Sequence, residues 1–275
     1  MSQKVWLVTG ASRGIGAEIA KAVLAAGDQL VAAARKVETL DYLGKQDNVF
    51  NVAMDVTNEE GVQEAVKLAL AHFGRIDVLV NNAGYGLLGG VEESSGTEVE
   101  KIYRTNVFGL LNVTRAVLPS MRERRSGYIF NLSSIGGYAS VAGWGVYSST
   151  KFAVEGISEA LHAEVAPLGI HVTIVEPGYF RTDFLDASSM VSTKTQMPDY
   201  AGTVGKIREF AVGHNHQQPG DPTKIGAALV QLANAANPPL RLPLGTDALA
   251  TIAEKNAFVA KETDQWKTLS ASTDF

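Results

Sequence analysis

The sequence predicts a single doubly wound α/β domain, in which a mostly parallel sheet carries helices on both faces. Three observations support this fold class. Short apolar runs alternate along the chain with longer segments of helical periodicity, which is the order of βαβ units. The apolar runs are nearly continuous, as is typical of parallel strands that are covered on both faces. The length of 275 residues allows one large domain with a sizeable core.

The predicted elements follow one another closely as far as residue 177. Strands are predicted at the short apolar runs, which are 5–8, 29–34, 49–54, 76–80, 127–133 and 171–177. Helices are predicted where apolar residues recur every three or four positions, which is the case at 14–26, 58–72, 97–119 and from 146 onward. After these come a helix at 222–236, a short edge strand at 240–244 and a helix at 246–268. The segment 183–215 is long, polar and rich in small residues, and is predicted to be a mobile lid.

The composition excludes several classes of protein. A net charge of −5 without a long basic run argues against nucleic-acid binding. The absence of cysteine excludes a disulfide scaffold, a thiolate metal site and a thiol nucleophile. No apolar segment is long enough for a signal peptide or a membrane span, so a soluble cytoplasmic protein is expected. No metal site is predicted, because His214 and His216 lie in a polar loop without a nearby carboxylate in the sequence.

A glycine-rich turn joins the first predicted strand to the first helix. Gly10, Gly14 and Gly16 are spaced as GxxxGxG, which permits a tight turn and a close approach of the backbone to a pyrophosphate. The free N–H groups at the helix N-terminus would then bind the phosphates. The alternative is a turn that only allows a helix to pack on a strand. The cofactor-binding residues predicted in this turn are Gly10, Ser12, Arg13, Gly14, Ile15 and Gly16.

The choice between NAD and NADP is predicted from two arginines. A site for NAD usually has an acidic residue at the end of the second strand, where it binds the ribose 2′-hydroxyl. Here that place carries Arg35, and Arg13 lies in the glycine turn. Because guanidinium groups bind phosphate bidentately, the two residues favour NADP. The alternative is two solvated surface arginines.

Tyr147 and Lys151 lie four residues apart at helical spacing, so both side chains are expected on one helix face. Free tyrosine has a pKa of about 10 and exchanges protons poorly at neutral pH. At about 4 Å and an effective dielectric constant of about 20, an ammonium group favours the phenolate by about 4 kcal/mol. That attraction would lower the tyrosine pKa by at most about 3 units. The pair is therefore predicted to act as an acid–base, and the alternative is a pair on a solvated face.

Six motifs occur in a fixed order: the glycine turn, NNAG (81–84), TNVFG (105–109), NLSSIGG (131–137), YSSTK (147–151) and EPGYFRT (176–182). Together they resemble the short-chain dehydrogenase/reductase family, which has a Rossmann fold, along nearly the whole chain to residue 182. YSSTKFAVEG and PLRLPLG most resemble the branch of 17β-hydroxysteroid and retinol dehydrogenase-like enzymes.

The resemblance implies four catalytic residues. Tyr147 is the acid–base, and Lys151 lowers its pKa and holds the nicotinamide ribose. Ser134 binds the substrate carbonyl, with Ser133 as the neighbouring candidate. Asn106 kinks its helix and holds a water molecule in a proton relay. The resemblance also assigns cofactor contacts to Asp55 and Val56 at the adenine, to Asn82, Ala83 and Gly84 at the adenosine ribose, and to Pro177, Gly178 and Thr182 at the nicotinamide.

These features predict an NADPH-dependent reductase of apolar or aromatic ketones or aldehydes, working reversibly as an alcohol dehydrogenase. The substrate pocket is expected to be apolar, formed by some of Leu87, Leu88, Ile135, Tyr138, Val141, Trp144, Tyr179, Phe180 and Phe184. Two alternatives are a nucleotide-sugar epimerase or dehydratase and a non-catalytic NADPH sensor. The glycine spacing and length argue against the first, and the intact Ser/Tyr/Lys set argues against the second. By analogy with the family, a homodimer or homotetramer is expected to form through the helices 97–119 and 146–166.

Overall fold

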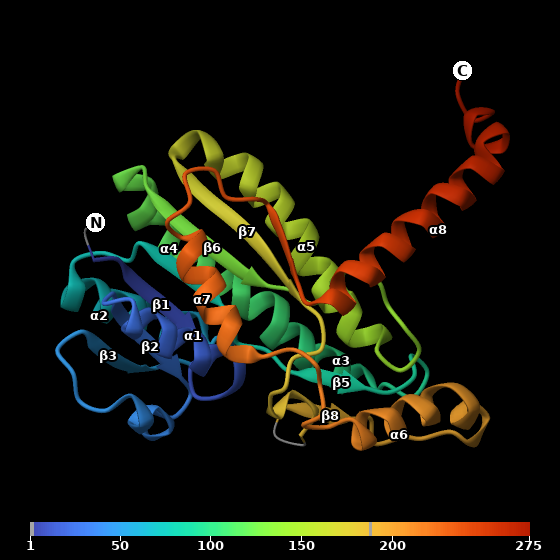
Figure 1. Ribbon diagram of the computed structural model, residues 1–275, viewed down its shortest axis with the longest axis horizontal. Helices are drawn as coiled ribbons and strands as arrows, with labels where there is room; N and C mark the ends of the chain where they lie inside the picture. Colours follow the sequence, from blue (N-terminus) through green and yellow to red (C-terminus); the bar gives the residue numbers. More distant parts are fainter. Residues whose placement is uncertain (1–2, 187–188) are drawn as a thin grey trace.

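The computed structural model describes residues 3–186 and 189–275, and a seven-stranded parallel sheet forms its centre (Figure 1). The strand order is β3-β2-β1-β4-β6-β7-β9. The strands are β1 Val5–Thr9, β2 Gln29–Ala34, β3 Val49–Ala53, β4 Val78–Asn81, β6 Gly127–Leu132, β7 Ile170–Pro177 and β9 Arg241–Leu244. The predicted strands, including the edge strand near 240–244, are thus confirmed to within two residues at each end.

Helices cover both faces of the sheet, which confirms the doubly wound class. On one face lie α1 (Gly14–Ala25) and α7 (Pro222–Leu232), and their apolar sides form one core with the sheet. On the other face lie α2 (Glu59–Phe73), α4 (Leu110–Arg124) and α5 (Gly145–Val165), which form the second core. The strand order reverses beside β1, and ligands of this fold class bind in the crevice at such a reversal.

The helix predicted at 97–119 is interrupted. It consists of α3 (Gly96–Tyr103), a π-helical turn (Arg104–Gly109) and α4. Gly109 ends the wide turn, and a Cβ there would lie 2.6 Å from Cγ2 of Val56. The glycine therefore allows this helix to lie directly against the loop after β3.

The segment predicted to be a lid is structured where it is described. It contains β8 (Met190–Ser192), which pairs in parallel with β5 (Gly86–Leu88), and α6 (Lys206–Gly213). Ala187 and Ser188 of the segment lie outside the described residues. The carboxylate of Glu93 anchors the segment, because it accepts a hydrogen bond from the N–H of Met197 at 2.8 Å and pairs with Arg208. Closure over a substrate stays a prediction, although this anchoring restricts it to part of the segment.

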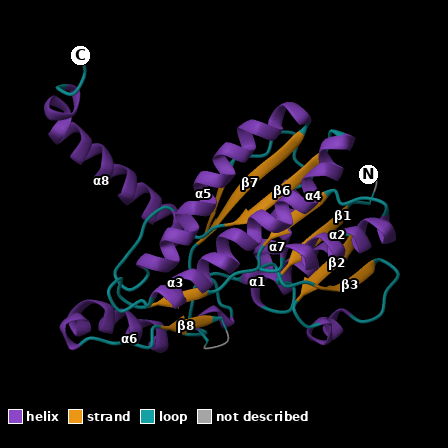
Figure 2. Cartoon of the chain, turned by 180° about the vertical axis from the view of Figure 1, so that it is seen from behind, coloured by secondary structure: helices purple, strands orange, loops and turns teal. Residues whose placement is uncertain are grey.

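The C-terminal helix α8 (Thr246–Ala271) extends away from the body of the molecule, as both ribbon views show (Figure 1, Figure 2). Of its side chains only Ala248 is buried. Within the described part of the chain, none of the helices combines the length and the apolar character that crossing a membrane would require.

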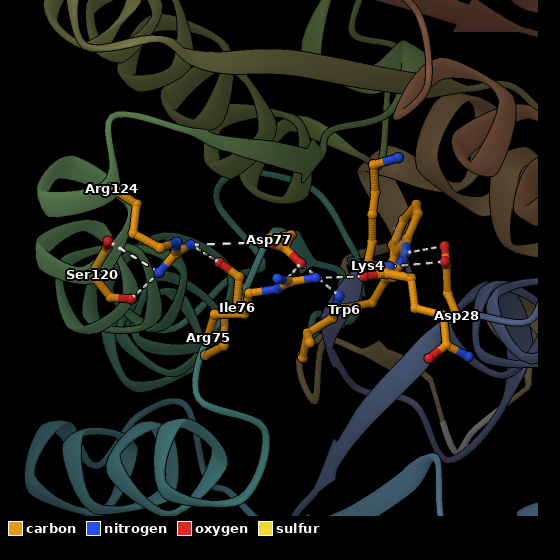
Figure 3. Close-up of polar contacts among 10 residues, drawn as sticks. Lys4, Trp6, Asp28, Arg75, Ile76, Asp77, Ser120 and Arg124 are labelled. Carbon is orange, nitrogen blue, oxygen red and sulfur yellow. Dashed lines mark hydrogen bonds and ion pairs between the residues drawn. The ribbon is translucent and has the colours of Figure 1, made fainter. Parts of the chain in front are cut away.

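The amino end of the sheet is held by two carboxylates, which Figure 3 shows. Asp77 accepts hydrogen bonds from the N–H of Val5 and from Arg75 Nε, both at 2.9 Å. Asp28 accepts from the N–H of Lys4 at 3.0 Å and from the indole nitrogen of Trp6 at 2.9 Å. These contacts fix the start of β1. The candidate site lies at the opposite, carboxyl end of the sheet.

Candidate active site

One cavity of about 750 Å³ lies at the carboxyl ends of the parallel strands. It gathers all the residues predicted to bind the cofactor except Gly16, and the catalytic candidate Asn106 does not line it either. Those lining it are Gly10, Ser12, Arg13, Gly14, Ile15, Arg35, Asp55, Val56, Asn82, Ala83, Gly84, Ser134, Tyr147, Lys151, Pro177, Gly178 and Thr182. The fold therefore brings together side chains that are up to about 170 positions apart in the sequence, while their individual roles stay predictions.

The glycine turn has a conformation that its glycines permit. Gly10 and Gly14 have φ values of +65° and +55°, which side chains rarely adopt. A Cβ on Gly16 would lie 2.2 Å from the carbonyl oxygen of Gly10. The side chain of the N-cap residue, Arg13, does not cap α1. The first N–H groups of α1 are therefore available to an anion at the cavity wall, which fits the pyrophosphate of a dinucleotide.

The NNAG segment is fixed against this turn by a residue that the sequence analysis did not single out. The buried hydroxyl of Thr9 accepts hydrogen bonds from the N–H groups of Asn82 and Ala83 at 3.0 and 3.1 Å. The amide of Asn82 donates to the carbonyl groups of Thr9 and Gly10 at 2.9 and 3.1 Å. The role of Thr9 could have been suspected from the sequence, because a polar threonine ends an otherwise apolar predicted strand. These four contacts hold two walls of the cavity in register.

The end of the cavity predicted to bind the adenosine is polar and open. Arg13 and Arg35 are both exposed and line it, and no carboxylate stands at the end of β2. Among the described residues, Arg35 has no ion-pair partner. Asp55 accepts hydrogen bonds from the N–H and hydroxyl of Thr57 at 2.9 and 2.8 Å, so one of its oxygens already stabilises the loop after β3.

Two further cations, which were not predicted from the sequence, line the cavity. Lys101 and Arg104 lie one turn apart, at the end of α3 and the start of the π-helical turn. Arg104 is paired with Glu100, with Nη2 at 2.7 Å from the carboxylate oxygen. The three-residue spacing of the two cations just before Asn106 was a signal that could have placed them on one face.

Tyr147 and Lys151 lie side by side on the buried face of α5, as predicted. The ammonium nitrogen of Lys151 is 5.9 Å from the centre of the Tyr147 ring and donates a hydrogen bond to the carbonyl of Leu132 at 2.7 Å. Ser134 is close enough to the Tyr147 hydroxyl to lower its pKa. The structure thus places Ser134, rather than Ser133, against the tyrosine.

The predicted lowering of the Tyr147 pKa by Lys151 is wrong for this state of the protein. Burial raises the pKa of Tyr147 to about 12, and the contact with Ser134 offsets only part of this effect. Burial also lowers the pKa of Lys151 to about 8. The predicted lowering assumed a pair near a surface, whereas both side chains are buried and the ammonium donates to the carbonyl of Leu132. Removal from water is therefore the largest influence on the pKa of both groups.

Asn106 lies within the π-helical turn, in agreement with the predicted kink. Its side chain is buried, accepts from the N–H of Tyr85 at 3.1 Å and donates to the carbonyl of Tyr85 at 2.9 Å. It also donates to the hydroxyl of Thr150 at 3.1 Å, which in turn bonds to the carbonyl of Tyr147. Asn106 is therefore tied to the helix that carries Tyr147 through Thr150, a link that no sequence pattern indicated.

The part of the cavity predicted to meet the nicotinamide follows β7. Gly178 lies against α8, since a Cβ there would be 2.2 Å from the carboxylate of Asp247. That carboxylate accepts a hydrogen bond from the N–H of Tyr179 at 2.6 Å. The Thr182 hydroxyl accepts one from the N–H of Phe184 at 3.3 Å, and its Cβ lies beside Gly14. Asp247 was not predicted, because it is separated from β7 by about 70 residues.

The substrate side of the cavity is apolar, and some of the predicted residues line it, as expected. Leu87, Leu88 and Tyr138 do not line it: the two leucines are buried in a core below, and the tyrosine hydroxyl bonds to Asn256 of α8. The predicted residues that do line it are Ile135, Val141, Trp144, Tyr179, Phe180 and Phe184. Leu185 and Val191 from the predicted lid are further lining residues.

One of the two lid histidines, His216, has carboxylates nearby in space, although none is close to it in the sequence. Nε2 of His216 is 3.3 Å from Asp186, and Asp183 lies in the same group. His214 instead stacks on Phe210, with ring centres 3.9 Å apart. The acidic residues are about 30 positions away, so the local sequence around His216 did not reveal them.

Comparison with known proteins gives consistent matches. A family model described as short chain dehydrogenase matches residues 4–191. A crystal structure of a short-chain dehydrogenase from Streptomyces avermitilis is 44% identical, with a TM-score of 0.93 and full coverage of both chains. Oxidoreductase BOA17 of Botryotinia fuckeliana is 39% identical over 98% of this chain and 99% of its own. The 3-ketodihydrosphingosine reductase of Bacteroides thetaiotaomicron is also 39% identical, over 89% of each chain.

Proposed function

The chain belongs to the short-chain dehydrogenase/reductase family and is an oxidoreductase, and from this premise we propose that it is an NADPH-dependent reductase of apolar or aromatic ketones or aldehydes. The observation that carries the proposal is the common position of Ser134, Tyr147 and Lys151 on one wall of the cavity whose other end is the glycine turn. A dinucleotide that starts at the turn would bring its reactive end to these side chains.

The hydroxyl groups at this wall and their protonation states suit the reduction of a carbonyl group. When bound, the nicotinamide supplies the hydride. The hydroxyl groups of Ser134 and Tyr147 would hold the carbonyl oxygen, and Tyr147 would donate its proton to that oxygen. Because burial raises the pKa of Tyr147 to about 12, the phenol is protonated at neutral pH, which is the form that reduction requires. The same burial leaves little phenolate at neutral pH to accept a proton from an alcohol.

The cofactor preference is supported by charge. Arg13 and Arg35 flank the end of β2, where a carboxylate that would repel a 2′-phosphate is missing. Guanidinium groups match phosphate in geometry and charge. These two residues support NADPH as the cofactor of this chain.

The substrate class is supported by the apolar wall. Trp144 and Phe184 stack with ring centres 6.4 Å apart, and Tyr147 lies 5.7 Å from Phe184, so the acid–base hydroxyl opens onto an aromatic surface. Ile135 and Val141 extend this surface. The relative from Bacteroides thetaiotaomicron bears the name of a keto reductase, which is consistent with a ketone substrate here.

We propose that a homo-oligomer forms through the helices at 97–119 and 146–166, which were expected to pair with a second copy. Phe108 of the π-helical turn and Phe152 of α5 are about half exposed, with 51% and 45% of their surface accessible. Both belong to the two helices expected to pair with a second copy. Burial of such side chains would stabilise a homodimer or homotetramer.

The test is the oxidation of NADPH and NADH, followed by absorbance, across steroid, retinoid, aromatic and aliphatic carbonyl compounds. We expect turnover with apolar ketones or aldehydes and a clear preference for NADPH. Cofactor binding without turnover on any carbonyl would contradict the proposed reaction and favour a sensor.

A further inference from the structure

Two buried carboxyl groups form a cluster that begins one helical turn beyond Lys151. Glu155 is on α5, one turn after Lys151, and Glu176 is near the end of β7. Arg241 of β9 joins them, since its Nη1 donates to Glu176 at 2.5 Å and to Glu155. Its Nη2 donates to Glu159 at 2.6 Å. One cation therefore serves two buried carboxyl groups and a third, exposed one.

The charge and the hydrogen bonds of this cluster do not balance if both buried groups are ionised. Among the described residues, the buried Oε2 of Glu176 makes no hydrogen bond, while the hydroxyl of Ser133 lies close enough to Glu155 to lower its pKa. An ionised oxygen without a donor is costly in such a place. Burial and the neighbouring carboxylate raise the pKa of Glu155 to about 7, and burial raises that of Glu176. A single proton held between the two carboxyl groups would remove the imbalance.

The pair contacts both elements that carry the proposed catalytic groups. Gly137 ends the short turn that follows Ser134, and a Cβ there would lie 2.4 Å from the hydroxyl of Ser133 and 2.9 Å from Oε1 of Glu155. The turn can therefore close onto Glu155 only because this residue is glycine. On the other side, the charge of Glu155 raises the pKa of Lys151, which opposes the lowering by burial.

We propose that Glu155 and Glu176 share one proton beneath Arg241, and that their remaining negative charge is the counter-ion of Lys151. Glu155 is thus a positioning residue of the active site. The titratable and charged groups that face the pair are Lys151 and Glu159 from α5, Arg241 from β9 and, against the guanidinium of Arg241, the ring of Tyr138 after Gly137. The inference rests on the proposed reductase function only for its consequence in catalysis, because the counter-ion itself is a property of the protein without ligands.

The consequence concerns the pH at which Lys151 loses its proton. Glu155→Gln keeps the shape of the side chain and leaves the remaining negative charge on Glu176, which is not among the groups that shift the pKa of Lys151, so the ammonium of Lys151 should be lost at lower pH. Glu176→Gln removes the partner that holds the proton, so Glu155 becomes fully ionised and Lys151 should keep its proton to the same or a higher pH. Glu159→Gln is the matched control, because Glu159 also binds Arg241 but is exposed.

The experiment is an NMR titration of the side-chain nitrogen of Lys151 in protein with ¹⁵N-labelled lysine, between about pH 5 and 11, without cofactor or substrate. The signal is assigned with Lys151→Met. We expect the midpoint to fall by about one pH unit or more in Glu155→Gln, as for loss of a nearby unit charge. It should stay within about 0.3 unit in Glu159→Gln, since exposed charges interact weakly.

An unchanged midpoint in folded Glu155→Gln would overturn the inference. If that variant does not fold, the test is the titration of Lys151 in Glu176→Gln. A lower midpoint in Glu176→Gln than in the wild type would overturn the inference. The pH profile of kcat/KM for NADPH supplies the catalytic readout, and its alkaline limb should move with the midpoint in Glu155→Gln. A shifted midpoint in a protein that reduces no carbonyl would refute the proposed function and leave the counter-ion in place.

Discussion

Replacing Gly16 by alanine tests how tightly the glycine turn closes on the first helix. The added Cβ would lie 2.2 Å from the carbonyl oxygen of Gly10 and 2.5 Å from Nδ2 of Asn82. Carbon and oxygen atoms in contact are normally about 3.3–3.6 Å apart, so the overlap with the carbonyl exceeds about 1 Å. The backbone must move, and the movement breaks the hydrogen bonds of Asn82 to Thr9 and Gly10.

The cost follows from these contacts. Forcing one extra carbon into a closely packed site costs about 1–3 kcal/mol. Each lost hydrogen bond adds about 1 kcal/mol, and the better helix propensity of alanine returns roughly 0.5–1 kcal/mol. The free energy of unfolding should therefore fall by about 2–4 kcal/mol. For a domain of this size each kcal/mol lowers Tm by about 2–4 °C, so Tm should fall by about 4–16 °C.

The assay is urea and thermal unfolding followed by far-UV circular dichroism, together with calorimetric titration of NADPH. Because the displaced turn also carries the predicted phosphate contacts, the affinity for NADPH should fall as well. Gly156→Ala is the control, since Gly156 lies in the middle of α5 and a Cβ there meets no atom within 4 Å. That variant should be as stable as the wild type or slightly more stable. If Gly16→Ala unfolded at the wild-type midpoint and bound NADPH normally, the packing argument would be refuted.

Four further predictions concern the proposed reaction. Tyr147→Phe removes the transferable proton, so kcat for carbonyl reduction should fall at least about 10²-fold with little change in NADPH affinity, and near-normal turnover would refute the role. Ala34→Asp with Arg35→Ser should abolish a preference for NADPH of about 10- to 200-fold, measured as kcat/KM for both cofactors; a wild type that used them equally would contradict the assignment. Burial lowers the pKa of Lys151 to about 8, so its ammonium is lost as pH rises through that value and kcat/KM for NADPH should decline above it, whereas a flat profile to pH 10 would count against a charged lysine. Limited proteolysis should cut within 183–215 and be slowed by NADPH with a substrate analogue, and equal rates would exclude closure of a lid.

The architecture could be predicted because its signals are local. Each parallel strand is an apolar run of four to eight residues, and Gly74 ends α2 in a left-handed conformation, as a glycine after a helix commonly does. The pairing of β5 with β8 had no such signal, since each strand has three residues and about 100 residues separate them. The order in the lid segment therefore comes from tertiary contacts, above all those of Glu93, rather than from its own pattern.

The features of the candidate site also fall into those that could be predicted from the sequence and those that could not. The residues of each motif could be named, because their spacing is short and the resemblance orders the motifs along the chain. The protonation of Tyr147 could not be predicted, because burial is a property of the folded surroundings and reverses the sign expected from the charge of Lys151. Glu155, Glu176 and Arg241 were missed because only the strand order brings β7 and β9 beside α5.

The projecting helix α8 makes two of the three tryptophans, Trp6 and Trp266, report on different events. Trp6 is fully buried and stacks near Phe130, so its emission follows the cooperative loss of the core. Trp266 is 57% exposed near the end of α8, where helix formation has little help from packing. Its surroundings should change at denaturant concentrations or temperatures far below the main transition. Total tryptophan emission will therefore trace two superposed curves, and Trp266→Phe should convert it into a probe of the body alone.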